Sequence, residues 1–259
     1  MNIILGLDVS TSCIGLTLAV NVNKELKIIQ VTHFRLKTPS KLKGIEALFH
    51  KSAYFETVLN DYKDLSKLGM GELKINHVVI EEPLIGSNNA FTASTLLRFN
   101  GMISQSVFNI LNVIPEFISS FDARKCAFPE LLAVRKYNKS GKVYPVEKIR
   151  KSLKEGNLVL FGEYPWDCDK KLILQSKISD MFADINWQYD KNGELKKENF
   201  DASDSLVCVL GYIHKHNMKE PTIPKIIDSS ETQCNGGIIF NYKMQFGNQT
   251  FDKIIELNE

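Results

Sequence analysis

The order of its apolar segments constrains the fold of this chain more than any other feature. Short apolar runs separated by polar turns predict strands, and apolar residues at helical spacing predict helices. In chain order, the predicted elements are strands at 3–8, 14–22 and 25–36, a helix at 43–65, a strand at 75–80, a helix at 90–111 and a strand at 115–119. Because strand–helix–strand crossovers are right-handed, this order predicts an α/β fold in which helices flank a mixed five-stranded sheet.

The remainder of the chain divides into an insertion, two further helices and a tail. Turn signals and one short helical pattern near 146–154 make about 126–165 an insertion. The two further helices are predicted near 169–183 and 202–216. Residues 238–246 and 250–256 then predict two strands in a β-rich C-terminal tail. We therefore expect one domain over residues 1–217, interrupted by the insertion, and an extension at 218–259 to which we assign no role.

The distribution of charge is more informative than the net charge of +2. Between Arg124 and Lys154 basic residues accumulate, whereas the acids of that segment are Glu130 and Glu147. Such a segment is a candidate surface for phosphate contacts. A charged run is more often a solvated face, and this alternative stays open.

The cysteines and the apolar runs indicate where the protein works. Five scattered cysteines without a C-x-x-C pair disfavour a disulfide framework and a structural zinc site. We read His214 and His216 as a solvated helix end. No run approaches the ~18 apolar residues of a membrane helix, and the N-terminal run reads as a strand rather than a signal peptide. The expected location is a reducing cytoplasm, that of a bacterium or a phage-infected cell.

Acidic residues stand where the predicted elements converge. Asp8 ends the first strand and Glu81 ends a strand parallel to it, so both carboxylates are expected at the same edge of the sheet. Asp201 and Asp204 are three residues apart and share a helix face. Carboxylates are ligands that Mg²⁺ prefers, and two such cations about 3.5–4 Å apart hydrolyse phosphodiesters. Singly, each acid could also be a turn residue, a solvated strand end or a helix cap.

The segments GLDVSTSCIGLTL, VVIEE and DASDSL resemble, in order and spacing, the three acidic motifs of RuvC-like Holliday-junction resolvases. The resemblance covers about residues 1–120 and 165–217. It implies an RNase H-like fold with two Mg²⁺ ions in the active site, for which Mn²⁺ substitutes. The implied metal ligands, which are also catalytic, are Asp8, Glu81, Asp201 and Asp204. Glu82 is the second choice for the position of Glu81.

The same resemblance implies a function: a magnesium-dependent, structure-selective endodeoxyribonuclease that resolves four-way DNA junctions in recombination and repair. Symmetric incision needs two active sites related by a two-fold axis, so a homodimer is expected. The segment SNNAFTAS resembles the family's loop that enters the junction, and Lys125 and Lys170 resemble basic residues near the scissile phosphate. Lys170 is therefore counted as catalytic. The expected DNA contacts are Lys125, Arg135, Lys136, Arg150, Lys151, Asn88 and Asn89.

Two other functions stay open. A non-catalytic DNA-binding module could have the same fold. An actin-like or sugar-kinase-type ATPase also opens with a turn like DVSTS, but it needs a second, glycine-rich turn that residues 118–121 do not supply. Phe91, Phe99 and Phe108 recur along one predicted helix and are expected in the core rather than as stacking partners of bases.

Overall fold

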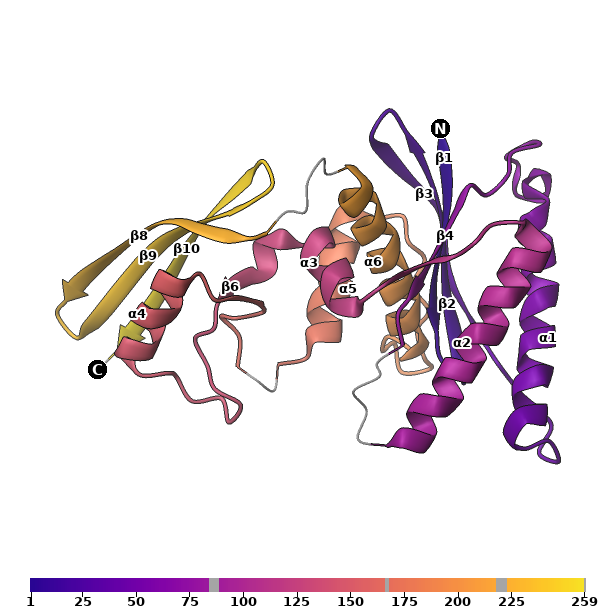
Figure 1. The fold of residues 1–259 in the computed structure, drawn as a ribbon, viewed down its shortest axis with the longest axis horizontal. Coiled ribbons are helices and arrows are strands. Elements are labelled where there is room, and N and C mark those ends of the chain that lie inside the picture. The colour runs from indigo at the N-terminus through magenta and orange to yellow at the C-terminus, as the bar shows by residue number, and fades with distance from the viewer. Residues whose placement is uncertain (84–88, 166–167, 218–222, 259) are drawn as a thin grey trace. The chain divides into compact units, whose positions relative to one another are not determined.

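A computed structural model describes residues 1–83, 89–165, 168–217 and 223–258 of the chain (Figure 1). These residues form two compact units. The first comprises Met1–Ala123 and Lys171–Tyr212, and the second Arg124–Lys170 and Ile213–Glu259. Within the described ranges, no helix combines the length and the apolar character that crossing a membrane requires.

The first unit is built around a mixed five-stranded sheet of order β3-β2-β1-β4-β5. β2 pairs with β1 and β3 in antiparallel register, whereas β1, β4 and β5 are parallel. The predicted mixed five-stranded sheet with flanking helices is confirmed. Its elements are β1 (Asn2–Val9), β2 (Cys13–Val22), β3 (Glu25–Arg35), α1 (Gly44–Lys63), a 3₁₀ turn at Leu65–Leu68, β4 (His77–Glu81), α2 (Ala90–Leu111), β5 (Glu116–Ile118), the first half of α3 (Ser120–Ala127), α5 (Lys170–Met181) from its second residue, and α6 (Glu198–Asn217) as far as Tyr212.

The two faces of β1 carry different residues. Alternate side chains along a strand point to opposite faces, and Ile3, Leu5 and Leu7 enter a core that also contains Phe55 of α1 and Phe99 of α2. Figure 1 shows α1 and α2 side by side on one face of the sheet and α6 on the other.

On the α6 face, glycines let two backbones approach closely. A Cβ atom on Gly6 would lie 2.4 Å from the carbonyl oxygen of Ser205, and one on Gly15 would lie 1.9 Å from that of Asp201. Helix α6 therefore lies directly on β1 and β2, with no side chain between the backbones at these positions. This contact fixes the height of α6 above the sheet.

The expectation that three phenylalanines of α2 are core residues is only partly right. Phe99 is fully buried, but Phe91 is 76% exposed and Phe108 is 44% exposed. Nine residues separate Phe99 from Phe108, which at about 3.6 residues per turn places them on opposite sides of the helix. Phe91 lies in the first turn of α2.

The second unit combines the insertion with the C-terminal tail. Its elements are a 3₁₀ turn at Pro129–Leu131, β6 (Leu132–Val134), α4 (Val146–Glu155), β7 (Leu158–Leu160), β8 (Lys225–Cys234), β9 (Gly237–Phe246) and β10 (Gln249–Asn258). The last three form an antiparallel sheet of order β10-β9-β8, so the predicted β-rich tail is confirmed. Phe240 and Tyr242 of β9 pack with Ile149 and Leu153 of α4, which gives the insertion and the tail a common core.

The close approach of α6 makes Gly6 sensitive to substitution. We expect Gly6→Ala to lower the free energy of unfolding by about 1–3 kcal/mol, because the new methyl would also lie 2.5 Å from Cγ2 of Val209. Gly101→Ala in α2 is the control: its methyl would meet no atom within 4 Å, and alanine favours a helix by up to about 1 kcal/mol over glycine. Urea unfolding measures both, and equal midpoints for Gly6→Ala and wild type would contradict the packing described.

Candidate metal centre

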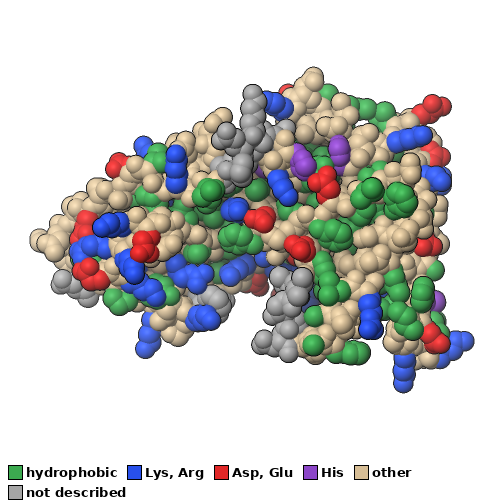
Figure 2. Space-filling model, viewed as in Figure 1, with side chains coloured by type: hydrophobic (Ala, Val, Ile, Leu, Met, Phe, Trp, Pro, Cys, Tyr) green, Lys and Arg blue, Asp and Glu red, His purple; other side chains and the backbone are tan. Residues whose placement is uncertain are grey.

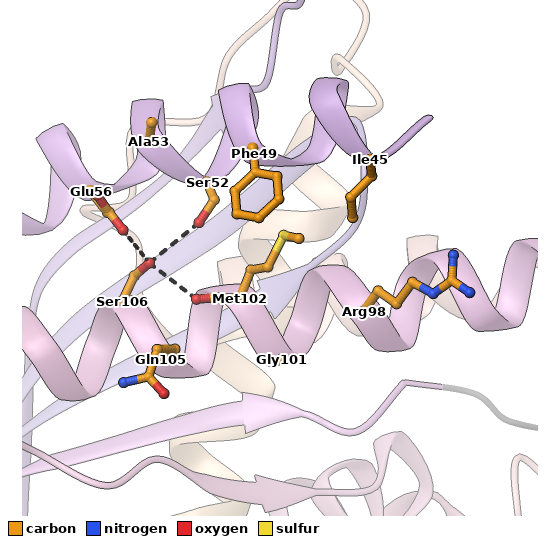
Figure 3. Close-up of a pocket in the computed structure, with 10 residues that line it drawn as sticks. All are labelled: Ile45, Phe49, Ser52, Ala53, Glu56, Arg98, Gly101, Met102, Gln105 and Ser106. Carbon is orange, nitrogen blue, oxygen red and sulfur yellow. Dashed lines mark hydrogen bonds between the residues drawn. The ribbon is translucent and has the colours of Figure 1, made fainter. Parts of the chain in front are cut away.

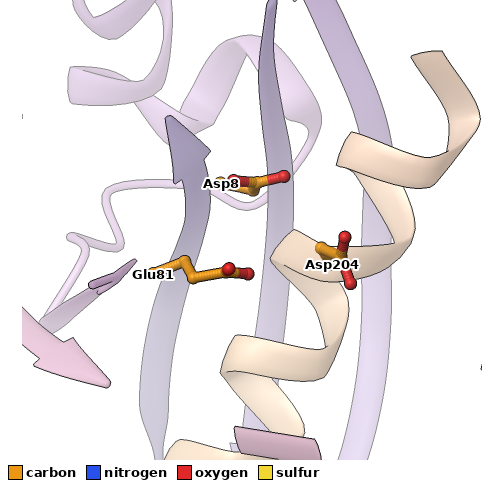
Figure 4. A group of neighbouring side chains, drawn as sticks. All are labelled: Asp8, Glu81 and Asp204. Atoms are coloured by element: carbon orange, nitrogen blue, oxygen red, sulfur yellow. The ribbon is translucent and has the colours of Figure 1, made fainter. Parts of the chain in front are cut away.

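Three carboxylates converge on the α6 face of the sheet. Asp8 comes from β1, Glu81 from the end of β4 and Asp204 from α6, and one oxygen from each lies within 4.8 Å of the others. Figure 4 shows the two strand residues and the helix residue pointing toward one another. Asp204 is buried and the other two are half-buried.

The strand register explains why Glu81, and not Glu82, joins Asp8. β1 and β4 pair in parallel with Gly6 opposite Val79, so the side chains two residues further along, Asp8 and Glu81, share the face that α6 covers. Glu82 lies beyond the end of β4. Its amide donates a hydrogen bond to the carbonyl of Ile118 at 2.8 Å, and its side chain is exposed.

Asp204 is held in place by its neighbour in sequence. The hydroxyl of Ser205 is 2.8 Å from that of Thr17 on β2, and both residues are fully buried. The Ser205 hydroxyl also donates to the carbonyl of Ala202 at 2.7 Å. This buried contact, together with Gly6 and Gly15, fixes the rotation of α6 and turns Asp204 toward the strand carboxylates.

The electrostatics of the site suit a cation. Burial, and then the negative charges of Glu81, Asp204 and Asp201, raise the pKa of Asp8 well above its ordinary value, while Lys171 lowers it. Carboxylates at such short range repel one another unless a cation neutralises them. Mg²⁺ and Mn²⁺ prefer this all-oxygen donor set. The residues present therefore fit a divalent metal.

Asp201, the fourth predicted ligand, lies beside this group with its carboxylate hydrogen-bonded by the thiol of Cys13 on β2. Its charge contributes to the raised pKa of Asp8. Burial raises the pKa of Asp201 itself, against the effects of the Cys13 hydrogen bond and of Lys171. Burial likewise raises the pKa of Cys13 to about 12, so this thiol keeps its proton at neutral pH.

A lysine that the sequence analysis did not select lies at the site. Nζ of Lys171 is 3.5 Å from Oδ2 of Asp204. The catalytic role predicted from the sequence for the preceding Lys170, the first residue of α5, stays a prediction. Successive helix residues point about 100° apart. The two adjacent lysines in Asp169-Lys170-Lys171 therefore indicated a basic residue at the site. The sequence could not show which of the two points toward Asp204.

The predicted DNA contacts occupy varied surroundings. Asn89 caps α2, where its side chain accepts hydrogen bonds from the amides of Phe91 and Thr92, whereas Asn88 lies outside the described residues. The ammonium group of Lys136 is 5.6 Å from the centre of the Tyr137 ring. Lys125 and Arg135 belong, like Lys136, to the second unit.

On α4 the basic side chains are partly neutralised. Arg150 donates to both carboxylate oxygens of Glu231, at 2.7 and 2.6 Å, and also contacts Glu147. Lys151 is 3.7 Å from Glu155. Figure 2 shows acidic side chains among the basic ones over this part of the second unit. Arg150 would therefore have to give up these carboxylate contacts to bind a phosphate.

A cavity of about 540 Å³ lies between α1 and α2, away from the carboxylates (Figure 3). Its wall is mainly apolar and includes Ile45, Phe49 and Met102. Behind them the hydroxyl of Ser106 donates to Oε1 of Glu56 at 2.7 Å. The cavity has no cluster of acids among its described lining residues, so it offers no alternative metal site.

Comparisons with known proteins found matches among solved structures. No protein-family model and no curated protein matches the chain. Solved structures do: Thermus thermophilus RuvC in complex with a Holliday-junction substrate is 11% identical, with 84% of this chain and 96% of RuvC covered at a TM-score of 0.47. The yeast mitochondrial Holliday-junction resolvase Ydc2 is 10% identical, with 82% of this chain and 77% of Ydc2 covered at a TM-score of 0.43. The fowlpox virus resolvase in complex with Holliday-junction DNA is 13% identical, with 83% of this chain and 99% of the resolvase covered at a TM-score of 0.34. The structure is similar to Holliday-junction resolvases.

The raised pKa of Asp8 predicts how Asp8→Asn changes stability in EDTA. Because its folded pKa lies above the ordinary 3.8, native Asp8 stabilises the fold below pH 3.8, and this contribution is lost as the pH rises through the folded pKa. Asp8→Asn should therefore melt higher than wild type at neutral pH, and the difference should shrink as the pH falls toward 4. Thermal unfolding across this range measures it.

With Mg²⁺ present, wild type should melt at a higher temperature than Asp8→Asn. A ligand that binds only the native state raises its melting temperature, so Mg²⁺ should stabilise wild type and have much less effect on Asp8→Asn. The same measurement separates a metal enzyme from a non-catalytic module. A melting temperature that Mg²⁺ leaves unchanged in the wild type would speak against a metal centre.

Proposed function

We propose that this protein is a magnesium-dependent endodeoxyribonuclease that resolves four-way DNA junctions. The observation that carries the proposal is the convergence of Asp8, Glu81 and Asp204 at the carboxyl ends of two parallel strands, against a helix whose position is fixed. The choice of four-way DNA junctions as the substrate rests on the three acidic motifs that resemble those of RuvC-like resolvases. The role would be in recombination and repair.

Each residue of the site has a definite task in this proposal. Asp8, Glu81 and Asp204 would hold two Mg²⁺ ions, or Mn²⁺ in their place, and Asp201 is the proposed fourth ligand. The chemistry that such ions supply is activation of water and stabilisation of the leaving oxygen. Lys171, 3.5 Å from Asp204, places a positive charge beside the reacting phosphate and offsets part of the carboxylates' repulsion of DNA.

The proposed substrate is branched DNA. Phe91 is 76% exposed in the first turn of α2 and belongs to the segment SNNAFTAS, which resembles the junction-entering loop of the family. Stacking of a base on an aromatic ring contributes about 1–3 kcal/mol, so an exposed ring here could hold an unpaired base. The proposal also includes a homodimer, since two incisions related by symmetry need two sites. The basic segment at 135–154 is proposed to contact a DNA arm, with Lys136 a better candidate than Arg150.

The two alternatives have less support. A non-catalytic DNA-binding module would not need carboxylates buried together, because like charges in such a place reduce stability. An ATPase would need a phosphate-binding turn at the end of β5. Instead, Ser119 there donates a hydrogen bond to Asp122 as α3 begins.

Replacing a metal ligand by its amide should abolish cleavage and preserve binding. We expect Asp8→Asn, Glu81→Gln and Asp204→Asn each to reduce cleavage of a four-way junction at least ~100-fold, because the amide keeps the shape but loses the charge that holds a hard cation. Asp201→Asn tests the fourth ligand in the same assay. Junction affinity without metal should stay equal or improve, since removing a negative charge lessens repulsion of phosphates.

Glu82→Gln is the matched control for Glu81→Gln and should cut like wild type, because its side chain is exposed beyond the end of β4. Assays run with Mg²⁺ and with EDTA on junctions, forks, flaps and linear duplexes measure activity and selectivity together. Normal cutting by Asp8→Asn, Glu81→Gln and Asp204→Asn would refute the nuclease proposal.

The catalytic contributions of Lys171 and Lys170 can be distinguished by replacing each one. Lys171→Ala should lower the cleavage rate of saturated junction about 10- to 100-fold, because a charge beside the reacting phosphate is lost, and Lys171→Arg should recover part of the rate. Lys170→Ala should have the smaller effect. The reverse ranking in single-turnover kinetics would return the catalytic role to Lys170.

A further inference from the structure

A polar cavity of about 540 Å³ adjoins the candidate metal centre within the first unit. It lies among the start of β2, the end of β3, the first turn of α5 and the first turn of α6. The residues that define it are Cys13, Arg35, Lys37, Lys171, Lys197 and Asp201. Two of them connect it to the carboxylates: Lys171 is paired with Asp204, and the charge of Asp201 acts on Asp8.

The charge of the cavity wall is opposite to that of the metal centre. Among the described residues of its wall, four are cationic, Arg35, Lys37, Lys171 and Lys197, and two are acidic, Glu198 and Asp201. Arg35 forms an ion pair with Glu198, and Lys171 is paired with Asp204. Lys37 and Lys197 are exposed. Lys37 follows β3 and Lys197 precedes α6, and both line the same cavity, which makes it a candidate anion site rather than a solvated charged face.

The wall also has an apolar part. Leu36 is buried and Phe200 is half-buried, and Nζ of Lys171 is 5.7 Å from the centre of the Phe200 ring. The volume lies within the range of about 300–1,000 Å³ typical of small-molecule sites, which is more than a bare phosphate needs. Cationic groups beside an apolar surface suit a phosphate that carries a sugar and a base.

We propose that this cavity binds a phosphodiester group of the DNA strand that is cut, next to the scissile phosphate. The inference rests on the proposed nuclease function and assigns to it a strand-positioning site formed by Lys37 and Lys197, with Arg35 at its edge. A strand that approaches four carboxylates is repelled by them. A neighbouring cationic cavity offsets that repulsion and holds the strand in register, and Lys171 is common to both places.

The test compares two double variants by their binding to a fluorescein-labelled four-way junction in Ca²⁺ and to Mn²⁺ alone. Lys37→Ala with Lys197→Ala should raise the junction Kd about tenfold and reduce the slope of log Kd against log salt by about 1–2, since each lost phosphate contact removes about 0.9. Lys63→Ala with Lys74→Ala, at exposed positions outside the cavity, should match wild type. Mn²⁺ affinity, measured by calorimetry, should be the same in all three proteins.

Three results would overturn the inference. The first is an unchanged junction Kd and salt slope in Lys37→Ala with Lys197→Ala, while Asp204→Asn is inactive; this leaves the nuclease proposal standing. The second is a rise in melting temperature with inorganic phosphate that this variant loses while keeping its junction Kd, which means that the cavity takes free phosphate instead of DNA. The third is a wild type that neither binds nor cuts junctions, which removes the proposed function and the inference together.

Discussion

The contact between α6 and the first two strands is the constraint on which the site depends. Gly6 and Gly15 leave no side chain between helix and sheet, and the Thr17–Ser205 hydrogen bond fixes the rotation of the helix. Asp8 stands two residues beyond Gly6 on the same face, so the face that admits the helix backbone also presents the first carboxylate. Packing and chemistry therefore use one strand face, while Ile3, Leu5 and Leu7 on the other face support it from the core.

The site is stabilised by its surroundings rather than by its own charges. Asp8 and Asp201 both have raised pKa values, with burial as the main cause, so ionising them opposes folding. The sheet and α6 hold these acids in place nevertheless, because the apolar core beneath them is large. An arrangement of this kind is useful when a cation completes it. Lys171 and the neighbouring cationic cavity surround this negative centre with positive charge that suits a nucleic-acid strand.

The fold and most of the site could be predicted from the sequence, and the rest could not for physical reasons. Asp8, Glu81 and Asp204 follow from strand ends and helix spacing, which are local patterns. The contact of Asp201 with Cys13 depends on how α6 rotates over β2, and the choice between Lys170 and Lys171 depends on where α5 begins. β8 was missed because its residues are nearly all exposed and carry no apolar alternation, and the common core of insertion and tail joins segments far apart in the chain.

Crystals soaked in Mn²⁺ and measured at the manganese absorption edge would show whether the three carboxylates bind a metal. We expect anomalous peaks among the carboxylate oxygens of Asp8, Glu81 and Asp204, and we expect these peaks to be lost in Asp204→Asn crystals. The same maps would reveal whether Asp201 leaves Cys13 to join them. Full Mn²⁺ occupancy elsewhere, with no peak at these three residues, would mean that they do not form the metal centre.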